Sequence, residues 1–265
     1  MKKHILFLAV LTTFLFNSCA IVHRSASVSN APASLQPAPA ILRQDVTHIM
    51  APGETLGLIS EMYDVPVDRI ISTNHLTHTA VLSPGQSLTI PKASALRSII
   101  PLYPSKKWKF IIIHHSATKE GDSLAFDQYH LKKGFGGIGY HFVIDNGTLS
   151  KVDGEIEATP RWLKQQDGRH CKASNMNRKA IGVCLVGNFN EGKVSERQMA
   201  LLVYLIDTLR HYYKIPPENI MGHGQVPGAD TDCPGKNFPW QEFNSRLRMF
   251  DVKNNFMSDK NFIKK

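Results

Sequence analysis

The chain has 265 residues, 42% of them hydrophobic and 20% charged, which is ordinary globular composition with room for one sizeable core and a smaller module. A formal net charge of +9 favours anionic partners such as acidic polymers and anionic lipid. We expect no nucleic-acid partner, because the sequence has no basic helix, no RNP-like aromatic pattern and no zinc-finger spacing.

Residues 1–19 have the pattern of an export signal. Two lysines precede an apolar run over residues 5–16, which is shorter than the about 20 residues that a membrane-spanning helix needs. The run leads to Cys19, and this ending resembles a bacterial lipoprotein signal with an acylated cysteine, although Phe16 stands where leucine is usual. Secretion with cleavage nearby is the alternative. Both interpretations predict an exported protein, and we expect it in the cell envelope, lipid-anchored in a bacterial membrane.

Residues 20–45 are predicted to form a flexible linker. They are rich in serine, alanine and proline and have too little apolar content to be buried. A coil of this length reaches roughly 25–30 Å, so it would let an anchored domain explore polymer above the lipid surface.

Residues 46–92 predict a small module with the element order β-α-α-β. A short strand at 48–50 is followed by a helix over 56–62, which Thr55 is placed to cap, and a second helix opens at 64–68. A turn and a strand over residues 82–91 close the module.

Several motifs in this module resemble a LysM domain: residues 52–56 (PGETL), 63–67 (YDVPV), Asn74 and 82–91 (LSPGQSLTIP). The resemblance covers the whole module. It implies binding to the N-acetylglucosamine-containing glycan of peptidoglycan or chitin. A small module of the same order without a ligand is the alternative.

A linker over residues 93–107 leads to the main domain, residues 108–250, and a polar tail follows at 251–265. The domain predicts an α/β fold, with a mixed central sheet flanked by helices. Its expected strands are at 110–114, 140–144, 148–152 and 181–186, and its expected helices at 124–133, 195–213 and 240–249. Residues 145–147 (DNG) indicate a hairpin, and residues 195–198 (SERQ) indicate a capping box.

A glycine-rich segment at residues 134–139 matches G-x-G-x-x-G. A dinucleotide site needs a strand before this motif and a helix after it. Here the expected order is inverted, so we reject a nucleotide cofactor and expect a turn beside a groove.

The cysteines stand at positions 19, 171, 184 and 233, and none forms a C-x-x-C pair. If Cys19 is lipidated and Cys233 binds a metal ion, only Cys171 and Cys184 remain. They could pair or stay free, and the apolar surroundings of Cys184 favour a buried free thiol.

Two distant segments, residues 111–118 (IIIHHSAT) and 222–235 (GHGQVPGADTDCPG), look like two halves of one metal site. Two imidazoles and a thiolate would give a three-ligand zinc site with one position open, which distinguishes a catalytic zinc from a structural one.

The main domain resembles the zinc-dependent N-acetylmuramoyl-L-alanine amidases, a family that includes peptidoglycan recognition proteins and phage amidase lysozymes. The motifs that carry the resemblance are residues 113–118, 139–144, His170, 180–189, and 222–223 with 231–235. Five motifs in the same order are more specific than any one alone.

The resemblance implies one zinc ion held by His114, His223 and Cys233. It also implies catalytic roles for Tyr140 and Thr231, and substrate contacts for His170 and, more weakly, Asn188. His115 should point to the opposite face of its strand from His114 and so not share the ion.

The implied reaction is hydrolysis of the amide between N-acetylmuramic acid and L-alanine in peptidoglycan. Zinc lowers the pKa of bound water from about 16 to about 7, and a hydroxyl of Tyr140 or Thr231 can help to stabilise the oxyanion. A non-catalytic peptidoglycan receptor is the main alternative, and a wall-tethering protein is another. The presence of Cys233 favours the enzyme, because the cysteine is replaced in receptors of the family.

Overall fold

The structure is a computed structural model that describes residues 43–249. The expected signal with Cys19, most of the 20–45 linker and the 251–265 tail lie outside these residues. Within the described part of the chain, none of the helices is both long and apolar enough to cross a membrane.

The first folded region has the predicted β-α-α-β order, made of β1 (Gln44–Ile49), α1 (Leu56–Tyr63), α2 (Val67–Thr73) and β2 (Ser87–Ala93). β1 and β2 form an antiparallel pair in which Val46 lies opposite Ile90. The first strand starts earlier than expected, inside the segment predicted to be linker. Thr55 caps α1 as predicted, since its hydroxyl accepts a hydrogen bond from the backbone N–H of Leu58.

Asn74, one of the LysM motif residues, joins the end of α2 to β2. Its side-chain amide donates to the carbonyl of Thr89 and accepts from the N–H of the same residue, both at 2.7 Å. Beneath this connection Ile59, Ile70 and Ile90 are fully buried. The motif asparagine therefore substitutes for a backbone partner and holds the helix layer on the two-stranded sheet.

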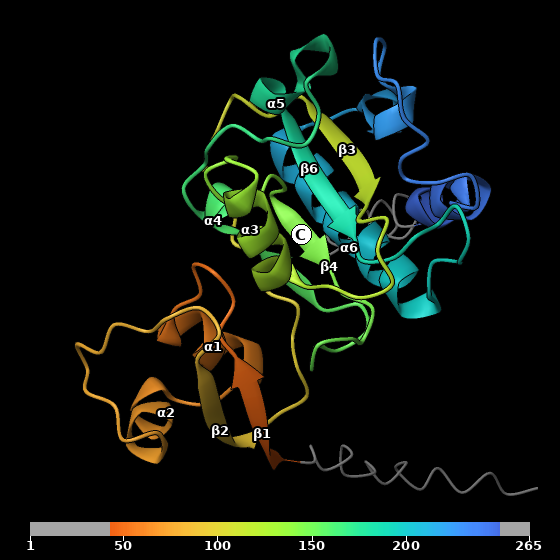
Figure 1. Cartoon of the computed structure of the whole chain (residues 1–265). Coiled ribbons are helices and arrows are strands. Elements are labelled where there is room, and N and C mark those ends of the chain that lie inside the picture. The colour runs from red at the N-terminus through yellow and green to blue at the C-terminus, as the bar shows by residue number, and fades with distance from the viewer. Residues whose placement is uncertain (1–42, 250–265) are drawn as a thin grey trace, which may run out of the picture. The chain divides into compact units, whose positions relative to one another are not determined.

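The second folded region is built on a mixed sheet, as predicted, and this sheet has five strands. The strands follow the spatial order β5-β4-β6-β3-β7, and β4, β6, β3 and β7 run parallel while β5 runs antiparallel to β4. Their bounds are β3 (Phe110–His115), β4 (Phe142–Ile144), β5 (Ile156–Ala158), β6 (Ala180–Leu185) and β7 (Ile220–Gly222). Figure 1 shows β4, β6 and β3 as adjacent arrows that point the same way.

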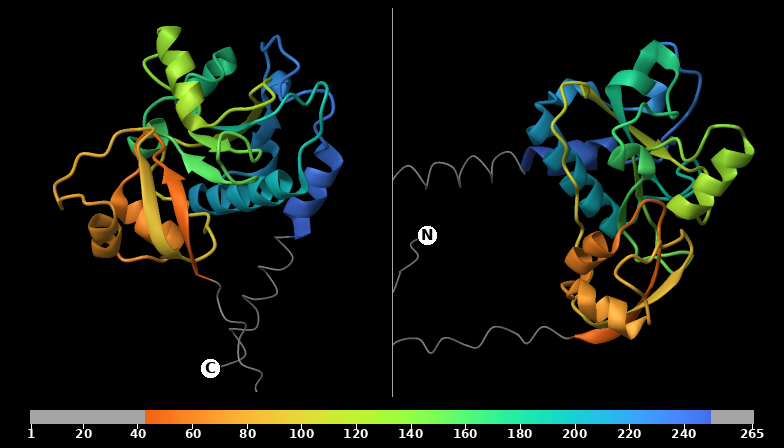
Figure 2. Two further views of the ribbon diagram at one scale, coloured as in Figure 1. Left: turned by 60° about the horizontal axis from the view of Figure 1, so that its bottom comes forward. Right: turned by 90° about the vertical axis from the view of Figure 1, so that its left-hand side faces the viewer.

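Helix α6 (Glu196–Tyr213) covers one face of this sheet (Figure 2). It begins at the predicted capping box of Ser195 and Gln198. Its apolar residues, including Leu202 and Ile206, pack with Ile111 and Ile113 of β3 in the main core. The apolar side of this helix is therefore part of the core.

The other face of the sheet carries α3 (Ser123–Lys132), whose Phe126 packs with Val143 of β4. Shorter elements complete the domain: α4 (Pro160–Leu163), η1 (Ala173–Asn175), α5 (Met176–Lys179), η2 (Pro217–Asn219), η3 (His223–Gln225) and a helix over residues 240–249. The glycine-rich segment 134–139 follows α3 and precedes β4, which is the inverted order expected from the sequence.

The predicted hairpin is wrong in its second strand. β4 pairs with Ile156–Ala158 and not with residues 148–152, so the connection is longer than the DNG turn implied. Leu149 and Ser150 have φ values of 51° and 64°, which a strand cannot accommodate. Leu149 and Val152 are also exposed, so the apolar side chains of this segment do not pack in the core.

Candidate metal centre and active site

Strand register brings two of the predicted ligands together. In the parallel β3–β7 pair Ile113 lies opposite Gly222, so the next residues, His114 and His223, are neighbours at the same end of the sheet. Their rings lie 4.8 Å apart. Because Ile113 faces the core under α6, the alternation of a strand turns His114 to the opposite face.

The third predicted ligand comes from the loop after β7. Cys233 Sγ lies 3.6 Å from His114 Nδ1 and accepts a hydrogen bond from the backbone N–H of His115 at 3.4 Å. Gly224 permits this approach, because a Cβ at that position would stand 2.3 Å from the carbonyl oxygen of Thr231. One donor atom from each of the three residues lies within 4.8 Å of the other two.

The donor set fits zinc. With Zn–N bonds of about 2.0–2.1 Å and a Zn–S bond of about 2.3 Å in a tetrahedron, the nitrogen and sulfur stand about 3.5–3.6 Å apart. The distance from His114 Nδ1 to Cys233 Sγ lies in that range. His114 and Cys233 are buried while His223 is only partly so, which leaves the cluster open to solvent on one side. Three protein ligands leave a fourth position for water or substrate.

Burial sets the protonation of these groups. It lowers the pKa of His114 well below the usual range and lowers that of His223 as well, so both imidazoles are neutral with a lone pair for metal. Burial raises the pKa of the Cys233 thiol to about 12, although the His115 N–H acts in the opposite direction. A bound zinc ion would take the place of the thiol proton.

His170 lies behind His114 and away from solvent. Its Nδ1 is 3.0 Å from His114 Nε2, and its own Nε2 is 3.3 Å from the carbonyl oxygen of Ala180. The side chain is buried, and burial holds the pKa of His170 well below the usual range. This setting differs from the groove-lining position that the resemblance implied.

The structure places Tyr140 and Thr231 beside the cluster. The ring of Tyr140 is 5.3 Å from that of His114, and burial, with the nearby sulfurs of Cys184 and Cys233, raises the pKa of the phenol well above its ordinary value. The phenol therefore keeps its proton at neutral pH. Thr231 is exposed, and its hydroxyl accepts from the backbone N–H of Cys233, which leaves the hydroxyl proton available to another acceptor.

Asn188 lies on the wall of a cavity of about 500 Å³ at the carboxyl ends of β3, β4 and β6. The next residue, Phe189, donates its backbone N–H to His115 Nδ1 at 3.1 Å. His115 therefore engages the strand-end loop while His114 engages the cluster, in line with their expected opposite directions. Cys171 and Cys184, whose pairing the sequence left open, are free and buried.

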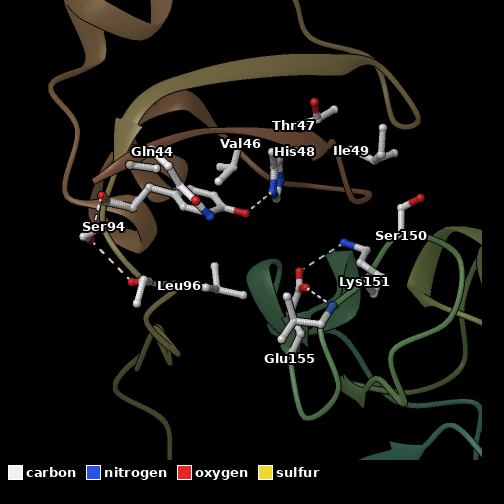
Figure 3. A pocket seen from close by; sticks show the side chains of 14 residues that line it. Gln44, Val46, Thr47, His48, Ile49, Ser94, Leu96, Ser150, Lys151 and Glu155 are labelled. Carbon is white, nitrogen blue, oxygen red and sulfur yellow. Dashed lines mark hydrogen bonds and ion pairs between the residues drawn. The ribbon is translucent and has the colours of Figure 1, made fainter. Parts of the chain in front are cut away.

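A second buried polar cluster was missed by the sequence analysis. We define the acidic cluster as Asp145, Lys151, Glu155 and Glu157. Lys151 Nζ lies 2.9 Å from Glu157 and 3.3 Å from Glu155, and Figure 3 shows the latter contact. Neither carboxylate oxygen of Asp145 has a hydrogen-bond partner among residues 43–249. The hairpin prediction had placed Asp145 in a turn and Lys151 in the strand at 148–152, so it gave no reason to bring these charged residues together.

Comparison with known proteins agrees with this geometry. A family model described as N-acetylmuramoyl-L-alanine amidase matches residues 104–236, half of the chain, and a model described as LysM domain matches residues 48–91.

Among relatives, the endolysin of Escherichia phage T7 is 36% identical over 143 residues, which is 51% of this chain and 85% of the endolysin. Peptidoglycan-recognition protein SC2 of Drosophila melanogaster is 29% identical over 143 residues, 50% of this chain and 71% of that protein. A solved structure, the endolysin amidase LysCS from Clostridium intestinale, is 33% identical with a TM-score of 0.46 and covers 54% of this chain and 84% of its own.

The His114, His223 and Cys233 cluster is thus the zinc site typical of these enzymes. The chain belongs to the N-acetylmuramoyl-L-alanine amidase family and carries an N-terminal LysM domain.

Proposed function

We propose that the protein hydrolyses the amide bond between N-acetylmuramic acid and the L-alanine of the stem peptide in peptidoglycan. The observation that carries this proposal is the convergence of two imidazoles and one thiol, from β3, η3 and the loop that follows η3, on a common point. The same arrangement favours an enzyme over a non-catalytic receptor, because the sulfur donor at position 233 is present and in reach of His114.

When bound, zinc supplies a Lewis acid for the carbonyl and lowers the pKa of a water ligand to about 7. The rest of the chemistry falls to the side chains. The neutral phenol of Tyr140 can donate to the oxygen on which negative charge develops, and the exposed hydroxyl of Thr231 is a second possible donor. The departing amine also needs a proton, for which the phenol of Tyr140 is a candidate source.

The LysM module provides the second half of the proposal, which is retention on the glycan. A module that binds polymer raises the local concentration of substrate around the linked catalytic domain without changing the chemical step. Deleting residues 46–92 should therefore weaken cleavage of intact sacculi more than cleavage of small soluble muropeptides. An equal loss on both substrates would contradict this division of labour.

We also propose that the protein acts in the cell envelope, held to a bacterial membrane by acylation of Cys19. The apolar run of residues 5–16 and the cysteine that follows it support this proposal. Growth with a labelled fatty acid should label the wild-type protein and not the Cys19→Ala variant. Equal labelling of the two proteins, or labelling of neither, would exclude the anchor at this residue.

Digestion of purified sacculi by the full chain, followed by mass spectrometry, tests the proposed reaction. The expected products are glycan strands without stem peptides, and free peptides that begin with L-alanine. Fragments with cleaved glycosidic bonds would instead indicate a different hydrolase. A chelator should stop the digestion and added zinc should restore it.

A further inference from the structure

The direction of two hydrogen bonds in the metal centre follows from chemistry alone. The carbonyl oxygen of Ala180 can only accept, so His170 Nε2 must carry a hydrogen and donate to it. A neutral imidazole has one hydrogen, which leaves His170 Nδ1 as an acceptor. His114 Nε2 must then donate to it across 3.0 Å. His114 Nδ1 is left with a bare lone pair, and this is the atom that faces Cys233 Sγ.

The fold holds the ring of His170 in place for this contact. A Cβ on Gly168 would stand 2.3 Å from His170 Cδ2, and a Cβ on Gly182 of β6 would stand 2.4 Å from the same atom. Because both residues are glycines, the imidazole of His170 occupies space that their side chains would otherwise fill. Asn177 fixes the backbone below, since its side-chain oxygen accepts the N–H groups of both His170 and Cys171 at 2.8 Å.

From these contacts we infer that His170 is a positioning residue for the zinc site: it selects the His114 tautomer whose Nδ1 lone pair points at the metal. The inference rests on the zinc site of the proposed function and deepens it. His170 does not reach substrate, because its side chain is buried and both ring nitrogens are already engaged. Without it, His114 Nε2–H would be a buried donor with no acceptor, and the other tautomer would carry its hydrogen on the metal-facing nitrogen.

Zinc affinity of the folded full chain, measured by competition with a chelator, tests the inference. Loss of a partner that orients a metal ligand typically lowers affinity about 10–100-fold, and this is the loss expected for His170→Leu. The variant His170→Asn, whose amide oxygen can accept where Nδ1 does, should recover most of the affinity. Wild-type affinity in a folded His170→Leu protein would overturn the inference.

His141→Leu is the matched control. This histidine is also fully buried, and its Nδ1 accepts the N–H of Gly182, but its ring nitrogens are bound to backbone groups and not to a zinc ligand. Its loss should leave zinc affinity near the wild-type value. An equal fall in both leucine variants would mean general loosening of the core and would also overturn the inference.

Nitrogen-15 NMR of the zinc-loaded chain gives a readout that does not depend on activity. His114 should show a slowly exchanging Nε2–H and a metal-bound Nδ1 in the wild type, and the Nε2–H signal should exchange fast or vanish in His170→Leu. If His170→Leu does not fold, the variant Gly168→Ala replaces it in the test. The added methyl group should push the His170 imidazole away from His114 without removing it, and unchanged zinc affinity in this variant would refute the inference. A wild-type chain that bound no zinc would instead refute the proposed function itself.

Discussion

The amidase domain buries two polar clusters, and they differ in how completely their groups are paired. In the zinc site, the nitrogens of His114 and His170 that face away from the metal have partners, and the remaining lone pairs point at a common place. In the acidic cluster, Glu155 and Glu157 share the amine of Lys151, and the oxygens of Asp145 have no partner among the described residues. The first arrangement prepares a binding site, whereas the second costs stability.

Electrostatics shows how the acidic cluster is tolerated. Burial and the neighbouring Glu157 raise the pKa of Asp145 well above its ordinary value, so this carboxyl is protonated at neutral pH. Burial alone would lower the pKa of Lys151, but Glu157 and Glu155 raise it above the ordinary value, so the amine stays charged. Lys151 is therefore the one cation beside the two glutamates, and the cluster depends on it.

The largest effect should come from Cys233→Ser, which removes the sulfur from the zinc site and leaves the acidic cluster intact. We expect amidase activity to fall below detection, because the site loses its only soft, anionic ligand. Glycan binding through the LysM module should be unchanged. Turnover of muropeptides measures the amidase activity, and a sacculus pull-down measures the glycan binding. Retained activity would contradict the assignment of Cys233 as a zinc ligand.

Lys151→Met makes the converse change, in the acidic cluster alone. Removing one partner of a buried ion pair leaves uncompensated charge and typically costs about 3–5 kcal/mol. The free energy of unfolding in urea should fall by that amount, while the fraction that stays folded binds zinc with wild-type affinity. A loss below about 1 kcal/mol would show that the carboxyl groups are solvated and not buried as described.

Tyr140→Phe tests the zinc site without touching its ligands. Losing one donor to a developing oxyanion typically lowers kcat about 10²–10³-fold, and zinc affinity should not change. The kcat of Thr231→Val, which lacks the second candidate hydroxyl donor, provides the comparison. A Tyr140→Phe enzyme with normal kcat would assign the oxyanion contact to Thr231 instead.

The smallest effect, and the only stabilising one, is expected for Asp145→Asn. A carboxyl whose pKa is raised on folding loses stability as the pH rises above the unfolded pKa of about 4, at up to about 1.4 kcal/mol per pH unit. The amide removes this loss, so the variant should be more stable than the wild type at neutral pH and nearly equal to it in acid.

Urea unfolding at two pH values measures this difference. The exposed Asp230→Asn is the matched control and should have no effect at either pH. Destabilisation of Asp145→Asn at neutral pH would mean that Asp145 is ionised and paired in the folded protein.

The same comparison explains what the sequence could and could not predict. The zinc ligands were predictable from the family resemblance, because the motifs that carry it are short and local: His114 lies in the motif at residues 113–118, and His223 and Cys233 lie in those at 222–223 and 231–235. Helix α6 was predictable from its capping box and apolar spacing. These features depend on neighbours within a few residues.

The missed features depend on tertiary contacts. The buried position of His170 depends on Gly182 of β6, whose missing side chain leaves space for the imidazole. No spacing in the sequence reveals this contact. The acidic cluster forms because β4 pairs with Ile156–Ala158, whereas the local DNG signal favoured a nearer partner. Lys151 was assigned to a strand for the same reason.

The central claim is that His114, His223 and Cys233 hold one zinc ion, and X-ray absorption at the zinc edge of the loaded full chain tests it most directly. The account predicts one sulfur neighbour at about 2.3 Å and two imidazole nitrogens at about 2.0–2.1 Å, with the sulfur lost in Cys233→Ser. A spectrum without sulfur in the wild type, or one that this substitution leaves unchanged, would contradict the account.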